Sequence, residues 1–130
     1  MKRILHALTT LCILSISITE AIAQTKVSFI PEITLIGNNE EIPDGDTLPI
    51  TKNNTHFGNV GLTTKVIKEF IIENDGPSPL IVSDISFSGE NASEFRLSET
   101  PTFPINIESN QHYKIQVVFA PTFGGTRSAF

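Results

Sequence analysis

Alternation of apolar and polar residues with a period of two is the feature that most restricts what this chain can fold into. It is clearest in the segment 112–119, whose apolar residues Tyr113, Ile115, Val117 and Phe119 fall on one face of an extended chain. Successive side chains of a β-strand point to opposite faces, so this pattern predicts a strand with one face on a core and the other in water. Shorter segments of similar character occupy 33–36, 66–73, 84–88 and 94–98.

Turn-forming residues separate these segments. Clusters of Gly, Pro, Asn, Asp, Ser and Thr occupy 74–79, 89–92, 100–104, 109–110 and 121–125. Gly permits a positive φ, Pro fixes φ, and Asn or Asp bonds to its own backbone, so each cluster is typical of a turn. No segment of ten or more residues after Gln24 has helical apolar spacing, so we expect an all-β fold. Short strands with connections of varied length favour a Greek-key antiparallel β-sandwich over a barrel.

The first 23 residues contain the three parts of a secretory signal peptide. A basic start at 1–3 precedes an apolar run over 4–18, and the small residues Ala21 and Ala23 follow it. The run is shorter than the ~20 residues of a membrane-spanning helix, which favours a cleaved signal over the alternative of an uncleaved anchor. We predict cleavage between Ala23 and Gln24, export of the remainder, and no membrane span in the mature chain.

The composition of residues 24–130 limits the partners of the exported part. It keeps seven of the nine Lys and Arg and thirteen of the fourteen Asp and Glu, a formal charge of about −6 that argues against nucleic acids as partners. The only cysteine, Cys12, would leave with the signal, so core packing rather than disulfides must hold the domain. The length fits one domain, with an N-terminal strand and acidic loop over 24–54 and the sandwich proper over 55–130.

An acidic loop is the best candidate in the sequence for a metal site. The four candidate ligands are Glu40, Glu41, Asp44 and Asp46. Ca²⁺ prefers oxygen ligands from flexible acidic loops, so calcium is the metal that these residues would suit. The EF-hand pattern is absent, and a solvated loop without metal is the alternative. Zinc is not expected, because the exported part has only His56 and His112 and no cysteine.

No pattern in the sequence predicts catalysis. The G-x-S-x-G nucleophile elbow is absent, and the segment 58–61 lacks the Lys-Ser/Thr pair of a phosphate-binding loop. His56 falls in a strand-entry turn, and His112 falls on the solvent side of a predicted strand. We therefore expect no enzyme activity, and we assign no catalytic and no cofactor-binding residues.

Several short motifs follow one another in a definite order along residues 33–130. They are Ile36-Gly37-Asn38, Ile42-Pro43-Asp44-Gly45-Asp46-Thr47, Thr55-His56-Phe57-Gly58-Asn59-Val60, Phe70-Ile71-Ile72-Glu73-Asn74-Asp75-Gly76, Ser88-Gly89, Glu94-Phe95, Val118-Phe119-Ala120-Pro121 and Gly124-Gly125-Thr126-Arg127-Ser128-Ala129. This ordered set resembles the choice-of-anchor D domains. Its later part is also similar to the broader ASH (abnormal spindle and hydin) class of immunoglobulin-like domains.

The resemblance implies a module that recurs in long bacterial surface proteins with varied C-terminal anchors. It implies no catalysis and no established binding residues. It also implies that the sandwich is immunoglobulin-like and has one more strand after 127–130, so the sequence is expected to be an N-terminal fragment whose sandwich is incomplete at its C-terminus. A sandwich that lacks its last strand has an unpaired edge, which is a template for strand addition.

The leading expectation is a non-catalytic structural or protein-interaction module of a secreted or cell-surface bacterial protein, with the periplasm as an alternative location. Its partners would be another protein or neighbouring domains of the same longer chain. Candidate contacts are the polar strand face at 112–116 and the unpaired edge. The alternatives are a carbohydrate- or calcium-binding accessory module of an exported enzyme and an ASH-type ciliary or centrosomal scaffold domain. The absence of Trp argues against a carbohydrate platform, and the signal peptide argues against a cytoplasmic scaffold.

Overall fold

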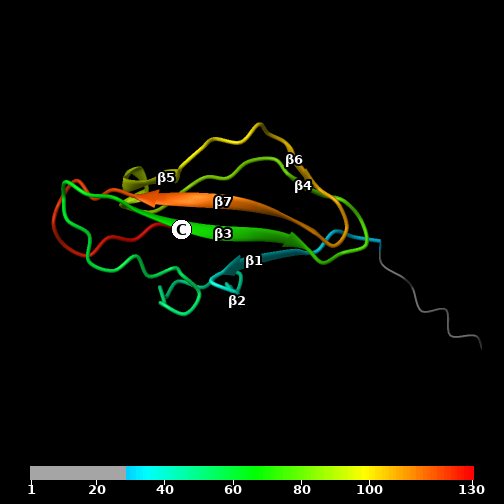
Figure 1. Ribbon diagram of the computed structural model, residues 1–130, viewed down its shortest axis with the longest axis horizontal. Coiled ribbons are helices and arrows are strands. Elements are labelled where there is room, and N and C mark those ends of the chain that lie inside the picture. The colour runs from blue at the N-terminus through cyan, green and yellow to red at the C-terminus, as the bar shows by residue number, and fades with distance from the viewer. Residues whose placement is uncertain (1–28) are drawn as a thin grey trace, which may run out of the picture.

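The computed structural model describes residues 29–130, which form two packed antiparallel β-sheets. The larger sheet has the strand order β2-β1-β3-β7-β5, and the smaller sheet pairs β4 with β6 (Figure 1). The elements in chain order are β1 (Ile33–Gly37), β2 (Glu40–Glu41), β3 (Val66–Asn74), β4 (Leu80–Val82), the 3₁₀ turn η1 (Ala92–Glu94), β5 (Phe95–Leu97), β6 (Ile105–Ile107) and β7 (Gln111–Phe119). The all-β antiparallel sandwich predicted from the sequence is confirmed.

The long pair β3–β7 forms the centre of the molecule. Nine consecutive residue pairs join these two strands along their whole length. Phe70 lies opposite Ile115, and Ile72 lies opposite Tyr113. Cross-strand neighbours share one face of a sheet, so these residues form the inner face that the period-two pattern predicted. β1 pairs with β3 on one side, and β5 pairs with the end of β7 on the other.

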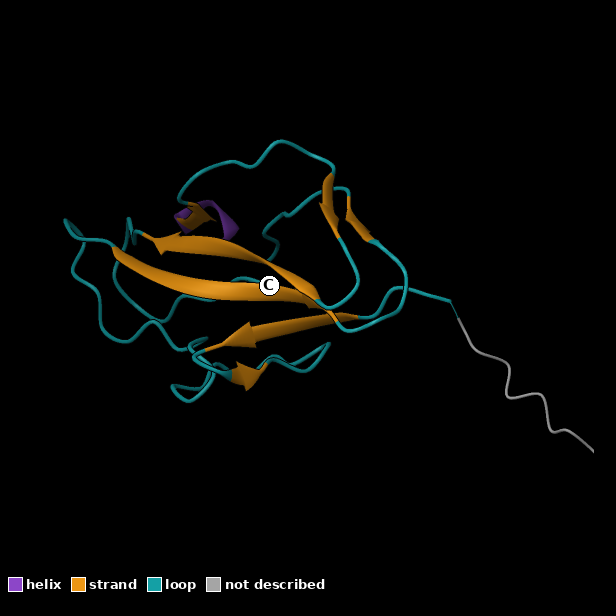
Figure 2. Ribbon diagram, turned by 45° about the vertical axis from the view of Figure 1, so that its right-hand side comes forward, coloured by secondary structure: helices purple, strands orange, loops and turns teal. Residues whose placement is uncertain are grey.

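The smaller sheet covers only one end of this inner face. β4 and β6 stand beside the end of the long strands at which β7 begins (Figure 2). Ile105 and Ile107 of β6 are buried against Ile72 of β3. Partly buried residues complete this core: Leu35, Leu80, Val82, Ile85, Phe103, Tyr113 and Ile115. The rest of the inner face depends on loops for its cover.

One buried amide joins three segments where β3 ends. Asn74 is 0% exposed. Its Nδ2 donates hydrogen bonds to the carbonyl oxygens of Ser78 at 2.8 Å and Ile107 at 2.9 Å. Its Oδ1 accepts hydrogen bonds from the backbone N–H groups of Glu32 at 3.2 Å and Gly76 at 3.1 Å. A side-chain amide has two donors and two acceptor positions, so every one of them is used here.

The sequence-based prediction missed both strands of the smaller sheet. β4 and β6 have three residues each, too few for alternation to stand out beside turn-rich neighbours. The segment 84–88, predicted as a strand, forms no regular strand in the structure, although its faces alternate as expected. β4 leaves its ladder at Val82, and beyond that residue the edge is mostly unpaired. The acidic loop predicted within 24–54 contains the short strand β2.

Candidate functional site

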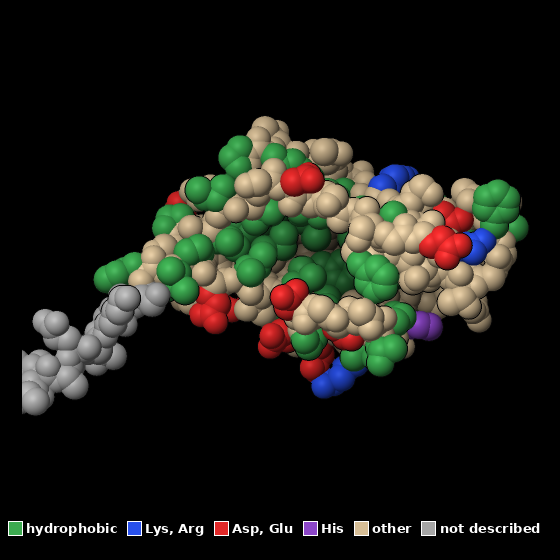
Figure 3. All heavy atoms as spheres, turned by 180° about the vertical axis from the view of Figure 1, so that it is seen from behind, with side chains coloured by type: hydrophobic (Ala, Val, Ile, Leu, Met, Phe, Trp, Pro, Cys, Tyr) green, Lys and Arg blue, Asp and Glu red, His purple; other side chains and the backbone are tan. Residues whose placement is uncertain are grey.

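An open apolar groove lies between the larger sheet and the loops that partly cover it. Its volume is about 1560 Å³. Adjacent strands of the sheet supply its inner wall, with the residues Leu35, Phe70, Ile115 and Val117. Residues 41–49, 85–87, 121 and 123–130 also line it. Figure 3 shows the hollow from this side, with hydrophobic side chains inside it. Apolar surface that a small domain leaves open to water is typical of a contact site.

Aromatic rings pack together along part of the groove. Phe95 of β5 stacks on Phe119 of β7, with ring centres 4.6 Å apart. Phe57 meets both rings edge-on, at 5.6 Å and 5.7 Å. Nζ of Lys68 lies 5.2 Å from the centre of the Phe57 ring and donates a hydrogen bond to the carbonyl oxygen of His56 at 2.7 Å. Aromatic packing and one cation–π contact therefore hold the loop around Phe57 against the sheet.

The segment 84–88 borders the groove with a strand edge that is only partly paired. The N–H of Ser88 donates to the carbonyl oxygen of Phe130 at 2.7 Å, and the N–H of Phe130 donates back to Ser88 at 2.9 Å. This reciprocal pair is the repeating unit of an antiparallel ladder. Within the described residues, the backbone groups of Ser86 and Asp84, the next positions on this edge, have no backbone hydrogen-bond partner. Across residues 29–130, this ladder consists of one rung.

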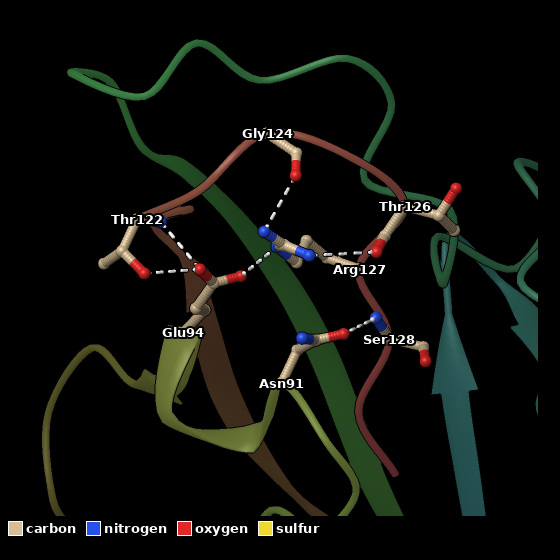
Figure 4. A network of polar contacts seen from close by, with 7 residues as sticks. All are labelled: Asn91, Glu94, Thr122, Gly124, Thr126, Arg127 and Ser128. Atoms are coloured by element: carbon tan, nitrogen blue, oxygen red, sulfur yellow. Dashed lines mark hydrogen bonds and ion pairs between the residues drawn. The ribbon is translucent and has the colours of Figure 1, made fainter.

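A buried carboxylate holds the segment 121–130 against η1 (Figure 4). Glu94 is 6% exposed, and its Oε1 accepts hydrogen bonds from the N–H of Thr122 at 2.7 Å and from its hydroxyl at 2.6 Å. Oε2 lies 3.1 Å from Nε of Arg127 in an ion pair. Nη2 of Arg127 also donates to the carbonyl oxygen of Gly124 at 2.9 Å. The carboxylate of Glu94 therefore contacts both ends of the turn between Thr122 and Arg127, and these contacts hold this wall of the groove in place.

The Glu94 contacts predict a pH-dependent stability. Hydrogen bonds from Thr122 hold the pKa of the Glu94 carboxyl below its ordinary value of 4.5, and the charge of Arg127 acts in the same direction against the effect of burial. A depressed pKa stabilises the fold above the unfolded pKa, and this contribution is lost as the pH falls through the folded pKa. E94Q is expected to lower the thermal midpoint at about pH 7, and this difference should shrink over the acidic range in which the folded Glu94 becomes protonated. Melting curves of both proteins across this range measure it; a pH-independent difference would contradict it.

In the structure, the four residues of the calcium hypothesis do not come together as a metal centre. Oε2 of Glu40 pairs with Nζ of Lys52 at 2.9 Å, and Oδ1 of Asp46 accepts a hydrogen bond from the N–H of Leu48 at 3.0 Å. Glu41, the last residue of β2, and Asp44, in the loop that follows, both line the groove. In the part of the chain that the structure describes, no three His, Cys, Asp or Glu residues are grouped closely enough to hold an ion. Calcium binding stays a prediction from the sequence alone.

Of the other predicted site residues, some lie within the described part of the chain and some lie outside it. Ala21, Ala23 and Gln24, the predicted signal peptidase positions, lie outside the described residues. His56 and His112 are exposed, and His112 is on the solvent side of β7 as predicted. Between residues 29 and 130, no helix has the length and apolar character needed to cross a bilayer.

Sequence reasoning missed Glu94 as a buried residue. Its alternation with Phe95 and Leu97 predicted a side chain in water, whereas the carboxylate is buried and engaged by Thr122 and Arg127. Asn91 has a similar role, because its Oδ1 accepts a hydrogen bond from the backbone of the same C-terminal segment at 3.1 Å. No local pattern signals these contacts, since the partners lie about 30 residues apart in the chain.

Comparison with known proteins does not assign the chain to a family. No family model, no curated protein and no solved structure matches it. The resemblance to choice-of-anchor D domains therefore stays a prediction. Function must be argued from the groove and its strand edge.

Proposed function

We propose that this chain is a non-catalytic protein-interaction module of a secreted or cell-surface bacterial protein, of the choice-of-anchor D type. The observation that carries the proposal is the apolar groove, in which Phe70, Ile115 and Val117 line one wall. Phe123 and Phe130 also line the groove, yet they are 72% and 60% exposed. Covering such surface with another polypeptide removes it from water, which is the main driving force of protein association.

Site-specific photo-crosslinking in cells that make the full-length protein tests this function. A photoreactive amino acid at Leu62 samples the groove, since this residue lines it and is 57% exposed. The same amino acid at Ile67 is the matched control: Ile67 is 44% exposed and lies outside the groove lining, on the other face of β3 from Phe70. We expect crosslinks to polypeptide from position 62 only. Equal yields at both positions, or adducts only with small molecules, would contradict the proposal.

Export is a separate prediction, from the first 23 residues. We expect the mature chain to begin at Gln24, because signal peptidase requires small residues at Ala21 and Ala23. A23E is expected to leave most of the protein as an unprocessed, membrane-associated precursor. Intact mass and N-terminal sequencing of the exported fraction measure the cleavage site. A serine at position 23 is the control, since its small side chain should preserve cleavage; a precursor that accumulates equally with both residues would contradict the prediction.

A further inference from the structure

We propose that the bond between Asp44 and Gly45 is a modification site, at which the chain isomerises to isoaspartate through a cyclic imide without an enzyme. The sequence contains Asp-Gly twice, at 44–45 and at 75–76. Among the dipeptides that begin with aspartate, Asp-Gly is the most prone to this reaction, because glycine has no side chain to obstruct the attack and its backbone turns freely. The fold exposes one copy and protects the other, so the inference concerns a single position.

The reaction conserves atoms and needs no co-reactant other than water. The backbone nitrogen of Gly45 attacks the side-chain carboxyl carbon of Asp44. The amide proton and one carboxyl oxygen leave as a water molecule when the imide closes. Water then reopens the imide at either carbonyl carbon. Opening at the main-chain carbonyl leaves the chain running through the side-chain carbons, as isoaspartate, and opening at the other carbonyl restores aspartate. The product keeps the mass and the charge but has one more backbone atom.

Both reacting groups are free of protein partners at the first copy. Asp44 and Gly45 are exposed. Within the described residues, the N–H of Gly45 donates no hydrogen bond and the carboxylate of Asp44 accepts none. A Cβ at Gly45 would have no neighbour within 4 Å, so the turn is open on that side. The turn closes through one bond of 3.1 Å, from the N–H of Asp46 to the carbonyl oxygen of Pro43. An exposed turn held in this way opens readily toward the geometry of attack.

The same dipeptide is protected where β3 ends. The N–H of Gly76, which would be the attacking group there, donates a buried hydrogen bond to Oδ1 of Asn74 at 3.1 Å. The N–H of Asp75 donates to the carbonyl oxygen of Glu32 at 2.9 Å. The backbone of residues 30–32 packs directly against Gly76. Closing the imide at Asp75 therefore requires local unfolding, and the rate falls with the population of the opened state.

Isomerisation at Asp44 would alter a loop that borders the groove. The extra backbone atom falls inside the ring that the hydrogen bond from Asp46 to Pro43 closes, so this bond is expected to be lost. The bond of 2.8 Å from the N–H of Ile42 to the carbonyl oxygen of Leu35 lies outside that ring and should remain. We therefore expect faster hydrogen exchange at Asp46 with little change in thermal midpoint. The surface beside the groove would change as the protein ages.

Ageing of the full chain in neutral buffer at physiological temperature tests the proposal. Peptide mapping separates isoaspartate from aspartate peptides, and electron-transfer fragmentation identifies the position. An isoaspartyl methyltransferase, used as a reagent with labelled S-adenosylmethionine, marks the new carboxylate by transfer of a methyl group. We expect isoaspartate to accumulate at 44 at least about tenfold faster than at 75. The chain kept in denaturant is the control: both positions should then react at rates within a few-fold of each other, because the protection at 75 comes from the fold.

Two variants assign the methyl label to one carboxyl group. D44E should abolish the label in the peptide that contains position 44, because glutamate would have to close a larger and less favourable ring. D46E is the matched control, since it changes the carboxylate on the other side of Gly45, which does not take part in the reaction. This variant should leave the rate at 44 nearly unchanged. Thermal melts of both variants identify any loss of folding, and the comparison of the two Asp-Gly positions needs no altered protein.

The outcomes decide the inference without touching the proposed function. Equal accumulation at 44 and 75 in the folded chain would mean that the fold does not select the site. A folded chain without isoaspartate at 44 would mean that the turn protects Asp44, whatever happens in denaturant. Label that enters the same peptide equally in D44E would place the reaction at another residue. Each of these three results would overturn the proposal, while crosslinking at the groove tests the interaction function independently.

Discussion

N74A is expected to lower the free energy of unfolding by about 3–4 kcal/mol, an effect comparable to truncating a buried apolar side chain. The amide of Asn74 is 0% exposed and makes four hydrogen bonds to backbone groups. Alanine would leave two N–H groups and two carbonyl oxygens without these partners, and an unpaired buried polar group costs ~1–3 kcal/mol. The Gly76 and Ile107 bonds are buried, while those to Glu32 and Ser78 are partly buried, so water recovers some of the loss.

Chemical denaturation of the full chain measures this effect, and N106A is the matched control. Asn106 is exposed, and its amide donates a hydrogen bond to the carboxylate of Glu108 at 2.7 Å, so its loss should change stability by less than about 0.5 kcal/mol. N74D provides a second comparison, because a carboxylate retains the two acceptors but faces the carbonyl oxygens of Ser78 and Ile107 without a donor. It should be at least as destabilising as alanine. A small loss in both Asn74 variants would show that water replaces the amide readily.

The larger sheet was predictable because its strands are long and have one buried face. In β7, the alternation from Tyr113 to Phe119 follows from the two-residue period of a strand that has a core on one side. The pattern fails at Val118, which is buried although it points to the opposite face from Phe119. β4 and β6 were not predictable in this way. Their pairing depends on which segments the larger sheet brings together, and three residues do not define a period.

The groove was only partly predictable, for a similar reason. The sequence showed which residues of 84–88 point inward, and the resemblance suggested an unpaired edge. The sequence did not show that Ser88 and Phe130 form a rung. It also did not show that Glu94 is buried and holds the C-terminal segment to which Phe130 belongs. These are contacts between residues far apart in the chain, and amino-acid type alone does not reveal them. The acidic loop shows the converse, since its carboxylates are close in sequence without forming a metal centre in the described structure.

G76A is expected to lower the free energy of unfolding by about 2–3 kcal/mol, although it adds a single methyl group. Gly76 is buried in the turn after β3, and a Cβ there would overlap the backbone N of Glu32 and lie 2.7 Å from the carbonyl carbon of Pro31. Backbone atoms cannot rotate aside as a side chain can, so the segment before β1 must move. That movement would strain the hydrogen bond of 2.9 Å from the N–H of Asp75 to the carbonyl oxygen of Glu32.

G124A separates steric overlap from the general cost of replacing glycine. A Cβ at Gly124 has no neighbour within 4 Å, and neither this residue nor Gly76 has a positive φ. G124A should therefore leave the denaturation midpoint nearly unchanged. Gly76 and Asn74 hold the same segment at Glu32, so N74A and G76A should couple: once the amide is lost, displacing that segment costs less. We expect the double variant to lose about 1 kcal/mol less than the sum of the two single losses. Strict additivity would mean that the amide and the glycine stabilise separate contacts, and that this end of the sandwich is not held by one shared junction.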